Sequence, residues 1–154
     1  MFYNCESRDG HSIDSSPKHL IFVDNCLVQS IPEHPKRDHV FCLSTAFGDA
    51  YLLDAPCLEE RDAWIAAIHS ACAAQMARNS GKAAVSHVLL EECGRLERSV
   101  ESESRSRHET ELLLAVIGDD AKQRQSLVSS VMSSEEKCER QRVEIFRLKC
   151  YLSA

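Results

Sequence analysis

Residues His39–Arg78 read HVFCLSTAFGDAYLLDAPCLEERDAWIAAIHSACAAQMAR, and this stretch decides the fold. The apolar runs Val40–Leu43 and Tyr51–Leu53 are typical of two short strands, and Gly48 between them predicts a tight turn. Pro56 then ends the pairing, because proline has no N–H group to donate to a neighbouring strand. The stretch therefore opens with a β-hairpin.

An amphipathic helix is predicted from near Cys57 onward. Glu59, Glu60 and Asp62 fall in its first turns, where negative charge suits the positive end of the helix dipole, whereas Cys57 is a poor capping residue. Apolar residues recur at steps of three and four and so predict one buried stripe, made of Leu58, Trp64, Ile65, Ile68, Ala71, Cys72 and Met76. Trp64 is the largest of them, and we expect it to be the structural anchor of the stripe.

Upstream of this stretch the chain predicts further strands. Leu20–Val23 and Cys26–Ile31 are apolar runs separated by a turn at Asp24–Asn25. Met1–Tyr3 predicts a short strand stub, and the polar segment Asn4–Lys18 predicts a loop. About five strands therefore precede the helix.

Downstream, the pattern changes to two long helices. Gly81 is a plausible cap of the preceding helix, and Asp119 or Asp120 can cap a new one after Gly118. The heptad positions of the first helix are Leu89, Cys93, Leu96, Val100, Leu114 and Ile117, with a weak seam where Glu103 and Arg107 fall at core positions. Those of the second helix are Leu127, Val131, Ser134, Cys138, Gln141, Ile145, Leu148 and Leu152. Two such helices joined by a short polar turn should form an antiparallel hairpin, which serves either as a partner-binding platform or as a spacer.

Several runs resemble one known family in the right order. A β-hairpin closed by a helix with an inward tryptophan is similar to the end of a pleckstrin-homology domain. The runs VQSIPEHPK, VFCLSTAFGDAYLL, AIHSACAA and FRLKCYLSA resemble the N-terminal pleckstrin-homology domain and coiled coil of the still life / T-lymphoma invasion and metastasis-inducing protein family. The members of that family are exchange factors for Rac-type GTPases. The resemblance covers roughly Leu20 to the end of the chain.

The resemblance implies an α+β fold. We expect residues 1–80 to form a partial, pleckstrin-homology-like sheet or barrel, with strands 3–7 and the C-terminal helix, and residues 81–154 to form the coiled-coil hairpin. Because a complete domain of this kind has seven strands, we expect a fragment, an alternative product or a mis-predicted gene start. The alternative is a divergent small domain that closes its sheet differently. The exchange domain of the family is not expected within these residues.

Charge and composition narrow the function classes. The net charge is −6, which disfavours nucleic-acid binding, and 44% hydrophobic with 27% charged residues suits a folded protein. The acidic excess lies mainly in residues 1–80, whose 6 basic and 11 acidic side chains give a net charge of −5. Residues 81–154 have 12 basic and 13 acidic side chains and a net charge of −1. No apolar run approaches the roughly 20 residues that span a bilayer.

Catalysis and cofactor binding have little support. The eight cysteines include no C-x-x-C pair, and we expect buried free thiols in a reducing compartment rather than a metal or disulfide framework. Neither a G-x-S-x-G motif nor a phosphate-binding glycine loop is present. His69 is interpreted as a helix-face histidine bonded to a neighbouring polar group. We therefore expect no catalytic residue, no metal and no cofactor.

Lipid binding has only weak candidates. Lys36 and Arg37 are basic residues of a surviving loop, while the lipid-binding loop of most such domains lies between their first two strands. Phosphoinositide binding is therefore doubtful. We expect a non-catalytic targeting and scaffold-binding region of a Rac-type exchange factor, cytoplasmic and peripheral at the plasma membrane in the full-length protein. Scaffold or receptor-tail proteins would bind the hairpin, and the GTPase would bind only through absent domains. The alternative is a stand-alone adaptor without any exchange domain.

Overall fold

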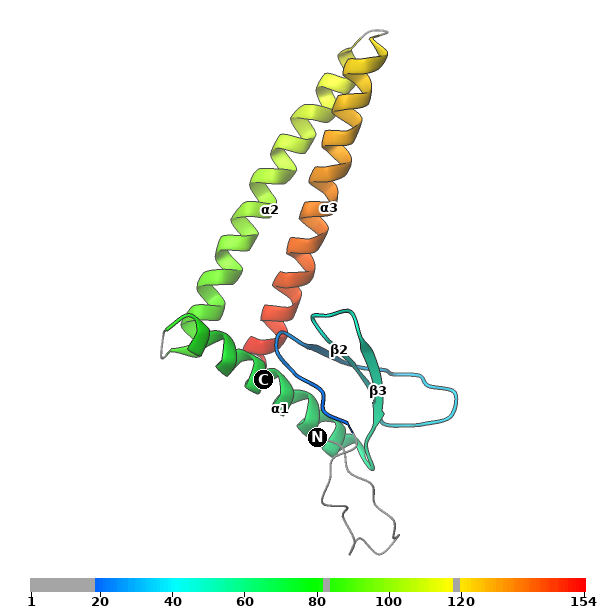
Figure 1. Cartoon of the computed structure of the whole chain (residues 1–154), viewed down its shortest axis with the longest axis vertical. Coiled ribbons are helices and arrows are strands. Elements are labelled where there is room, and N and C mark those ends of the chain that lie inside the picture. The colour runs from blue at the N-terminus through cyan, green and yellow to red at the C-terminus, as the bar shows by residue number, and fades with distance from the viewer. Residues whose placement is uncertain (1–18, 82–83, 118–119) are drawn as a thin grey trace, which may run out of the picture.

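A computed structural model describes residues 19–81, 84–117 and 120–154 of the chain, and these form a three-stranded antiparallel sheet followed by three helices (Figure 1). The elements are β1 Leu27–Ser30, β2 Val40–Ser44, β3 Ala50–Asp54, α1 Leu58–Asn79, α2 Val85–Val116 and α3 Ala121–Leu152. The expected α+β class is confirmed, and the described sheet is not closed into a barrel. The expected stub at Met1–Tyr3 and loop at Asn4–Lys18 lie outside the described residues.

The β-hairpin at the centre of the sequence forms as predicted. β2 pairs with β3 from Val40 opposite Asp54 to Ser44 opposite Ala50. The turn closes with a 2.8 Å bond from the Thr45 N–H to the Asp49 carbonyl, and Gly48 has a positive φ of 93° that suits glycine. β2 is the central strand, so its apolar side chains reach the core.

One predicted strand is wrong. Leu20–Val23 has no strand pairing and runs as irregular chain towards β1. The carbonyl of Val23 accepts a hydrogen bond from the Cys72 thiol at 2.7 Å, so α1 occupies a group that a neighbouring strand would have used. Ile21 and Val23 nevertheless pack against the core, which is the burial that their apolar pattern predicted.

The three helices begin and end close to where their sequence signals lie. Cys57 makes no side-chain capping bond to α1, and Gly81 follows that helix at a φ of +65°. Asp120 caps α3, because its side chain accepts from the N–H groups of Lys122 and Gln123. Asp119, the other candidate cap, lies outside the described residues.

The core lies where the sheet, α1 and the base of the α2–α3 hairpin meet. α1 crosses the base of the hairpin, whose two helices run side by side away from the sheet (Figure 1). One cluster of buried side chains joins all three parts and includes Cys26, Val28, Phe41, Leu43, Cys72, Ala73, Leu89, Cys93, Leu96, Leu148 and Tyr151. Among the described helices, none has a segment long and apolar enough to cross a bilayer.

Candidate partner-binding platform

A set of polar bonds joins the C-terminal end of α3 to the chain that enters β1. The Tyr151 hydroxyl donates to the Cys26 carbonyl at 2.5 Å, and both groups are buried. The Arg147 guanidinium donates to the Asn25 carbonyl at 2.9 Å and to the Glu144 carboxylate at 2.5 Å. The Asp24–Asn25 turn, where Asn25 has a φ of 53°, presents these carbonyls to α3.

His69 supplies the matching bond from α1. The backbone N–H of Val28 in β1 donates to His69 Nε2 at 3.1 Å, so the imidazole must be neutral at that nitrogen. Burial also lowers the pKa of His69, which favours the neutral imidazole. Its ring centroid lies 5.5 Å from that of Tyr151, which brings α1 and α3 together at β1. The interpretation of His69 as a histidine bonded to a polar neighbour is confirmed.

The cysteines near this junction act as small apolar side chains. Burial raises the pKa of the Cys26 thiol to about 11, so the thiol stays protonated. Cys72 donates its S–H to Val23, as above, and both cysteines belong to the shared core. Each of the seven cysteines within the described ranges is free, and those ranges contain no cluster of three metal-ligating side chains.

The α2–α3 hairpin presents a mixed-charge surface. Some ion pairs lie within one helix, such as Arg105–Glu101 at 3.0 Å and Arg95–Glu92 at 2.5 Å. Two carboxylates of α2 instead reach across to α3. Glu97 binds Lys149 at 2.9 Å, and Glu103 binds Lys137 at 2.5 Å. These cross-helix pairs lower the pKa of Glu103 and raise that of Lys149.

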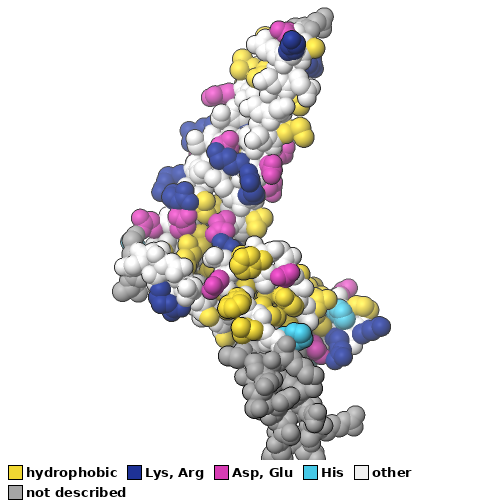
Figure 2. Space-filling view, viewed as in Figure 1, with side chains coloured by type: hydrophobic (Ala, Val, Ile, Leu, Met, Phe, Trp, Pro, Cys, Tyr) yellow, Lys and Arg dark blue, Asp and Glu magenta, His cyan; other side chains and the backbone are white. Residues whose placement is uncertain are grey.

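Exposed apolar side chains also lie on the hairpin. Near its tip are Leu112, Leu113, Val116, Val128 and Met132, and further along α3 are Val143 and Phe146. Figure 2 shows charged side chains distributed along the hairpin, and a dense gathering of apolar side chains over α1 and the sheet. The hairpin thus exposes apolar side chains set among charged ones.

Of the two weak lipid-binding candidates, Arg37 lines an open polar pocket of about 410 Å³ in its own loop, together with the acidic residues Glu33 and Asp38. Arg37 makes an exposed 2.8 Å ion pair with Asp54 at the end of β3. The backbone N–H of Lys36 donates to His34 Nδ1 at 3.4 Å within the same loop. The structure therefore places Arg37 against a carboxylate, and its role in lipid binding stays a prediction.

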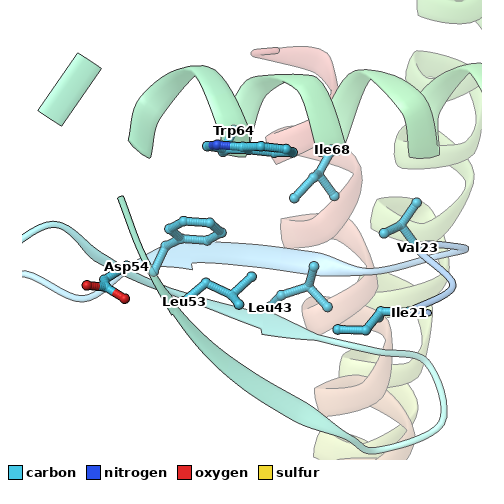
Figure 3. Close-up of a pocket in the computed structure, with 8 residues that line it drawn as sticks. Ile21, Val23, Leu43, Leu53, Asp54, Trp64 and Ile68 are labelled. Atoms are coloured by element: carbon cyan, nitrogen blue, oxygen red, sulfur yellow. The ribbon is translucent and has the colours of Figure 1, made fainter. Parts of the chain in front are cut away.

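Trp64 lines an open apolar cavity between the sheet and α1. This cavity has a volume of about 270 Å³, and Figure 3 shows the indole over the sheet, with Asp54 at one end and Ile21 and Val23 at the other. The expected burial of Trp64 is wrong, because 57% of the residue is exposed. The described sheet reaches Phe41 and Leu53 beneath the ring but leaves its flank uncovered. Whether Trp64 anchors the stripe stays a prediction.

Sequence comparisons agree with this architecture. Residues 1–73 match the PH domain family, and residues 98–154 match the T-lymphoma invasion and metastasis CC-Ex domain family. Over all 154 residues the chain is 49% identical to Protein still life, isoform SIF type 1, of Drosophila melanogaster, of which it covers 7%. It is likewise 33% identical to the human and 34% identical to the mouse Rho guanine nucleotide exchange factor TIAM2, covering 9% of each. The chain spans less than a tenth of the length of these relatives.

Proposed function

The chain belongs to the still life and T-lymphoma invasion and metastasis family, and we propose that it is a non-catalytic targeting region that docks scaffold or receptor-tail proteins for a Rac-type exchange factor. Its human and mouse relatives are Rho guanine nucleotide exchange factors. We assign nucleotide exchange, and contact with the GTPase, to parts of such proteins other than the PH and CC-Ex regions.

The junction between α3 and β1 is the observation that supports this proposal. Tyr151, Arg147 and His69 bind backbone groups at the start of β1, and the buried cluster continues through them from sheet to hairpin. A hairpin that served only as a spacer would not require such a fixed base. A hairpin held at a set orientation can present its side chains to a partner at low entropic cost.

We place this region in the cytoplasm, with peripheral attachment at the plasma membrane as part of the larger protein. Lys36 and Arg37 are its candidate phosphoinositide contacts, and the pair Arg37–Asp54 is solvent-exposed. Exposed ion pairs contribute little free energy, so a polyanionic headgroup could displace Asp54. The acidic charge of the chain opposes such attachment, and we expect its contribution to be small.

Competition in cells tests the docking role. The whole chain, expressed beside a full-length still life-type exchange factor, should displace that factor from its cortical sites and lower the level of GTP-bound Rac. The double variant Met132→Lys and Phe146→Lys should lose this effect, because it charges the exposed apolar face of α3 without touching the core. Ser129→Lys on the same helix is the control. Undiminished competition by the double variant would contradict docking through this face.

Liposome co-sedimentation tests the membrane role separately. The chain should bind vesicles containing phosphoinositide more than neutral vesicles, and Lys36→Ala with Arg37→Ala should remove the difference. Lys122→Ala with Arg124→Ala at the hairpin tip removes the same charge elsewhere and should leave the difference intact. Equal binding by the two double variants would show that the loop is not the contact.

A further inference from the structure

The middle of the hairpin contains a polar cleft that neither end of it shares. At the base, the seam between α2 and α3 is filled by Leu89, Leu96 and Leu148, but half-way along it holds Glu103 and Arg107 opposite Ser134. A cleft of about 290 Å³ opens there between the two helices. Two basic side chains, one carboxylate and five hydroxyl-bearing side chains line it.

Two buried polar atoms in this cleft lack hydrogen-bond partners. These are Arg107 Nε and Ser134 Oγ, and Ser134 as a whole is only 9% exposed. Ser134 lies close enough to the Glu103 carboxylate to help lower its pKa, after Lys137, but makes no hydrogen bond of normal geometry with it. Buried polar atoms nearly always have a hydrogen-bond partner, so these two atoms favour the binding of water or an ion in the cleft.

The charged neighbours of Arg107 leave its guanidinium only loosely held. Its Nε lies 3.5 Å from Glu111 and its Nη1 lies 3.7 Å from Glu135, whereas charge-assisted bonds are normally about 2.7–2.9 Å long. Lys137 binds Glu103 at 2.5 Å, which neutralises the one carboxylate in the lining. The lining itself carries two cations, Arg107 and Lys137, and one carboxylate, Glu103, while Glu111 and Glu135 contact Arg107 from outside it.

From this arrangement we infer that the cleft is a binding site for one tetrahedral oxyanion of the phosphate class. Arg107 supplies planar N–H donors, Lys137 an ammonium, and Ser134 a buried hydroxyl, which together suit an acceptor with several oxygens. A metal cation fits poorly, because the lining holds a single carboxylate that is already paired. Glu111 and Glu135 oppose the anion from the rim and limit its affinity.

The inference stands apart from the docking proposal, since it rests on the seam of the hairpin and not on its outer face. The same chemistry could come from free phosphate or from a phosphorylated side chain. The volume exceeds that of a few waters at about 30 Å³ each, so either source can enter with part of its hydration.

Titration of the 154-residue chain with sodium phosphate, followed by amide NMR, tests the site. Saturable shifts should centre on the residues that line the cleft, and sodium chloride at the same ionic strength should not produce them. Arg107→Gln and Lys137→Ala should each weaken binding by roughly tenfold, the loss expected for a bond to a charged group. Arg105→Gln and Arg140→Ala are matched controls and should change the dissociation constant for phosphate by less than about twofold.

Ser134→Ala separates binding from folding. It removes a buried hydroxyl that makes no hydrogen bond of normal geometry, so the hairpin should melt nearly as before while phosphate binding weakens. A capped phosphoserine tripeptide, beside its unphosphorylated form, identifies the source: shifts at the cleft with the phosphopeptide assign a side chain, and shifts with phosphate alone assign the free ion. Absence of saturable shifts with both probes, or binding untouched by Ser134→Ala and Arg107→Gln, would show that the cleft holds water only.

Discussion

At the scale of single residues, three polar side chains join the hairpin to the sheet. His69, Arg147 and Tyr151 bind the backbone at Val28, Asn25 and Cys26, the short segment that leads into β1. The Val28 N–H and the Cys26 carbonyl would otherwise be buried without partners, which costs about 1–3 kcal/mol for each group, whereas the bond from Arg147 to Asn25 is exposed. The position of the hairpin therefore depends on a few directed bonds as well as on apolar burial.

His69 predicts a loss of stability in mild acid. In the folded chain, burial lowers the pKa of His69 below its ordinary value of 6.5. The unfolded chain therefore takes up the proton first as the pH falls. Stability should be full above pH 6.5 and decline below it. The groups that face the ring, Tyr151 from α3 and the Val28 backbone from β1, do not titrate in this range. Urea midpoints at several pH values would measure the decline.

His69→Gln should flatten that dependence, because glutamine cannot take up a proton. His87→Gln, on the exposed face of α2, is the control and should retain the wild-type slope. Identical pH slopes for His69→Gln and the wild type would contradict the assignment.

Tyr151→Phe should destabilise the chain by about 1–3 kcal/mol, because it leaves the buried Cys26 carbonyl without its donor. Chemical denaturation followed by circular dichroism would measure the change. Tyr51→Phe removes the same hydroxyl from a partly exposed position in β3 and should have little effect. Equal losses from the two variants would argue against a special role for the junction.

Trp64→Ala should lower the free energy of unfolding much less than a typical truncation in the core does, because 57% of the residue is exposed. Phe41 lies beneath Trp64 and is only 3% exposed, so Phe41→Ala should lower the free energy of unfolding by about 3–5 kcal/mol. Trp64 is the only tryptophan in the chain, so acrylamide quenching of its fluorescence reports its exposure directly. Strong protection from the quencher would show that something covers the ring in solution.

At the scale of elements, the hairpin is uneven along its length. Leucine and cysteine fill its seam at the base, whereas Ser99, Glu103, Lys137 and Gln141 form polar contacts across its middle. Gln141 donates to Ser99 at 2.8 Å, but its own Oε1 is buried without a partner. Polar seams of this kind set the register of a helix pair while contributing less stability than apolar ones.

Amide hydrogen exchange should follow this difference. Residues 99–110 and 130–141 should exchange faster than residues 88–96 and 145–151, because less apolar surface is buried around them. Replacing Glu103 and Lys137 together by leucine should raise protection in the middle of the hairpin. Uniform protection along both helices in the wild type would contradict the prediction.

At the scale of the whole molecule, the described chain exposes a large apolar area beside the sheet. The exposed side chains on and around the sheet are Leu20, Phe22, Phe47, Leu52, Leu58 and Trp64, and Trp64 also lines the cavity. Exposed apolar surface of this extent favours association with another surface. The α2–α3 hairpin runs away from the sheet (Figure 1) and leaves these side chains exposed.

The isolated chain should therefore self-associate as its concentration rises. Light scattering after size exclusion should show masses above that of the monomer, and Leu52→Lys with Trp64→Lys should reduce them. Ser129→Lys with Ser133→Lys adds the same charge to the hairpin and should not reduce the measured masses. A monomer at all concentrations with a sharp two-state melt would contradict the prediction.

The sequence by itself determined the strands of the central hairpin, the extent of the three helices and the heptad seam, because such patterns depend on residues a few positions apart. The runs that resemble the exchange-factor family were likewise sufficient to indicate its PH domain and its coiled coil, and the match of residues 98–154 is to the CC-Ex domain. Only the tertiary structure decided that Leu20–Val23 forms no strand, that Trp64 stays half uncovered and that Glu97 and Glu103 pair across the hairpin. These outcomes depend on bonds such as that between Tyr151 and Cys26, which join residues 125 positions apart. Local periodicity carries no information about which distant backbone group a polar side chain will meet.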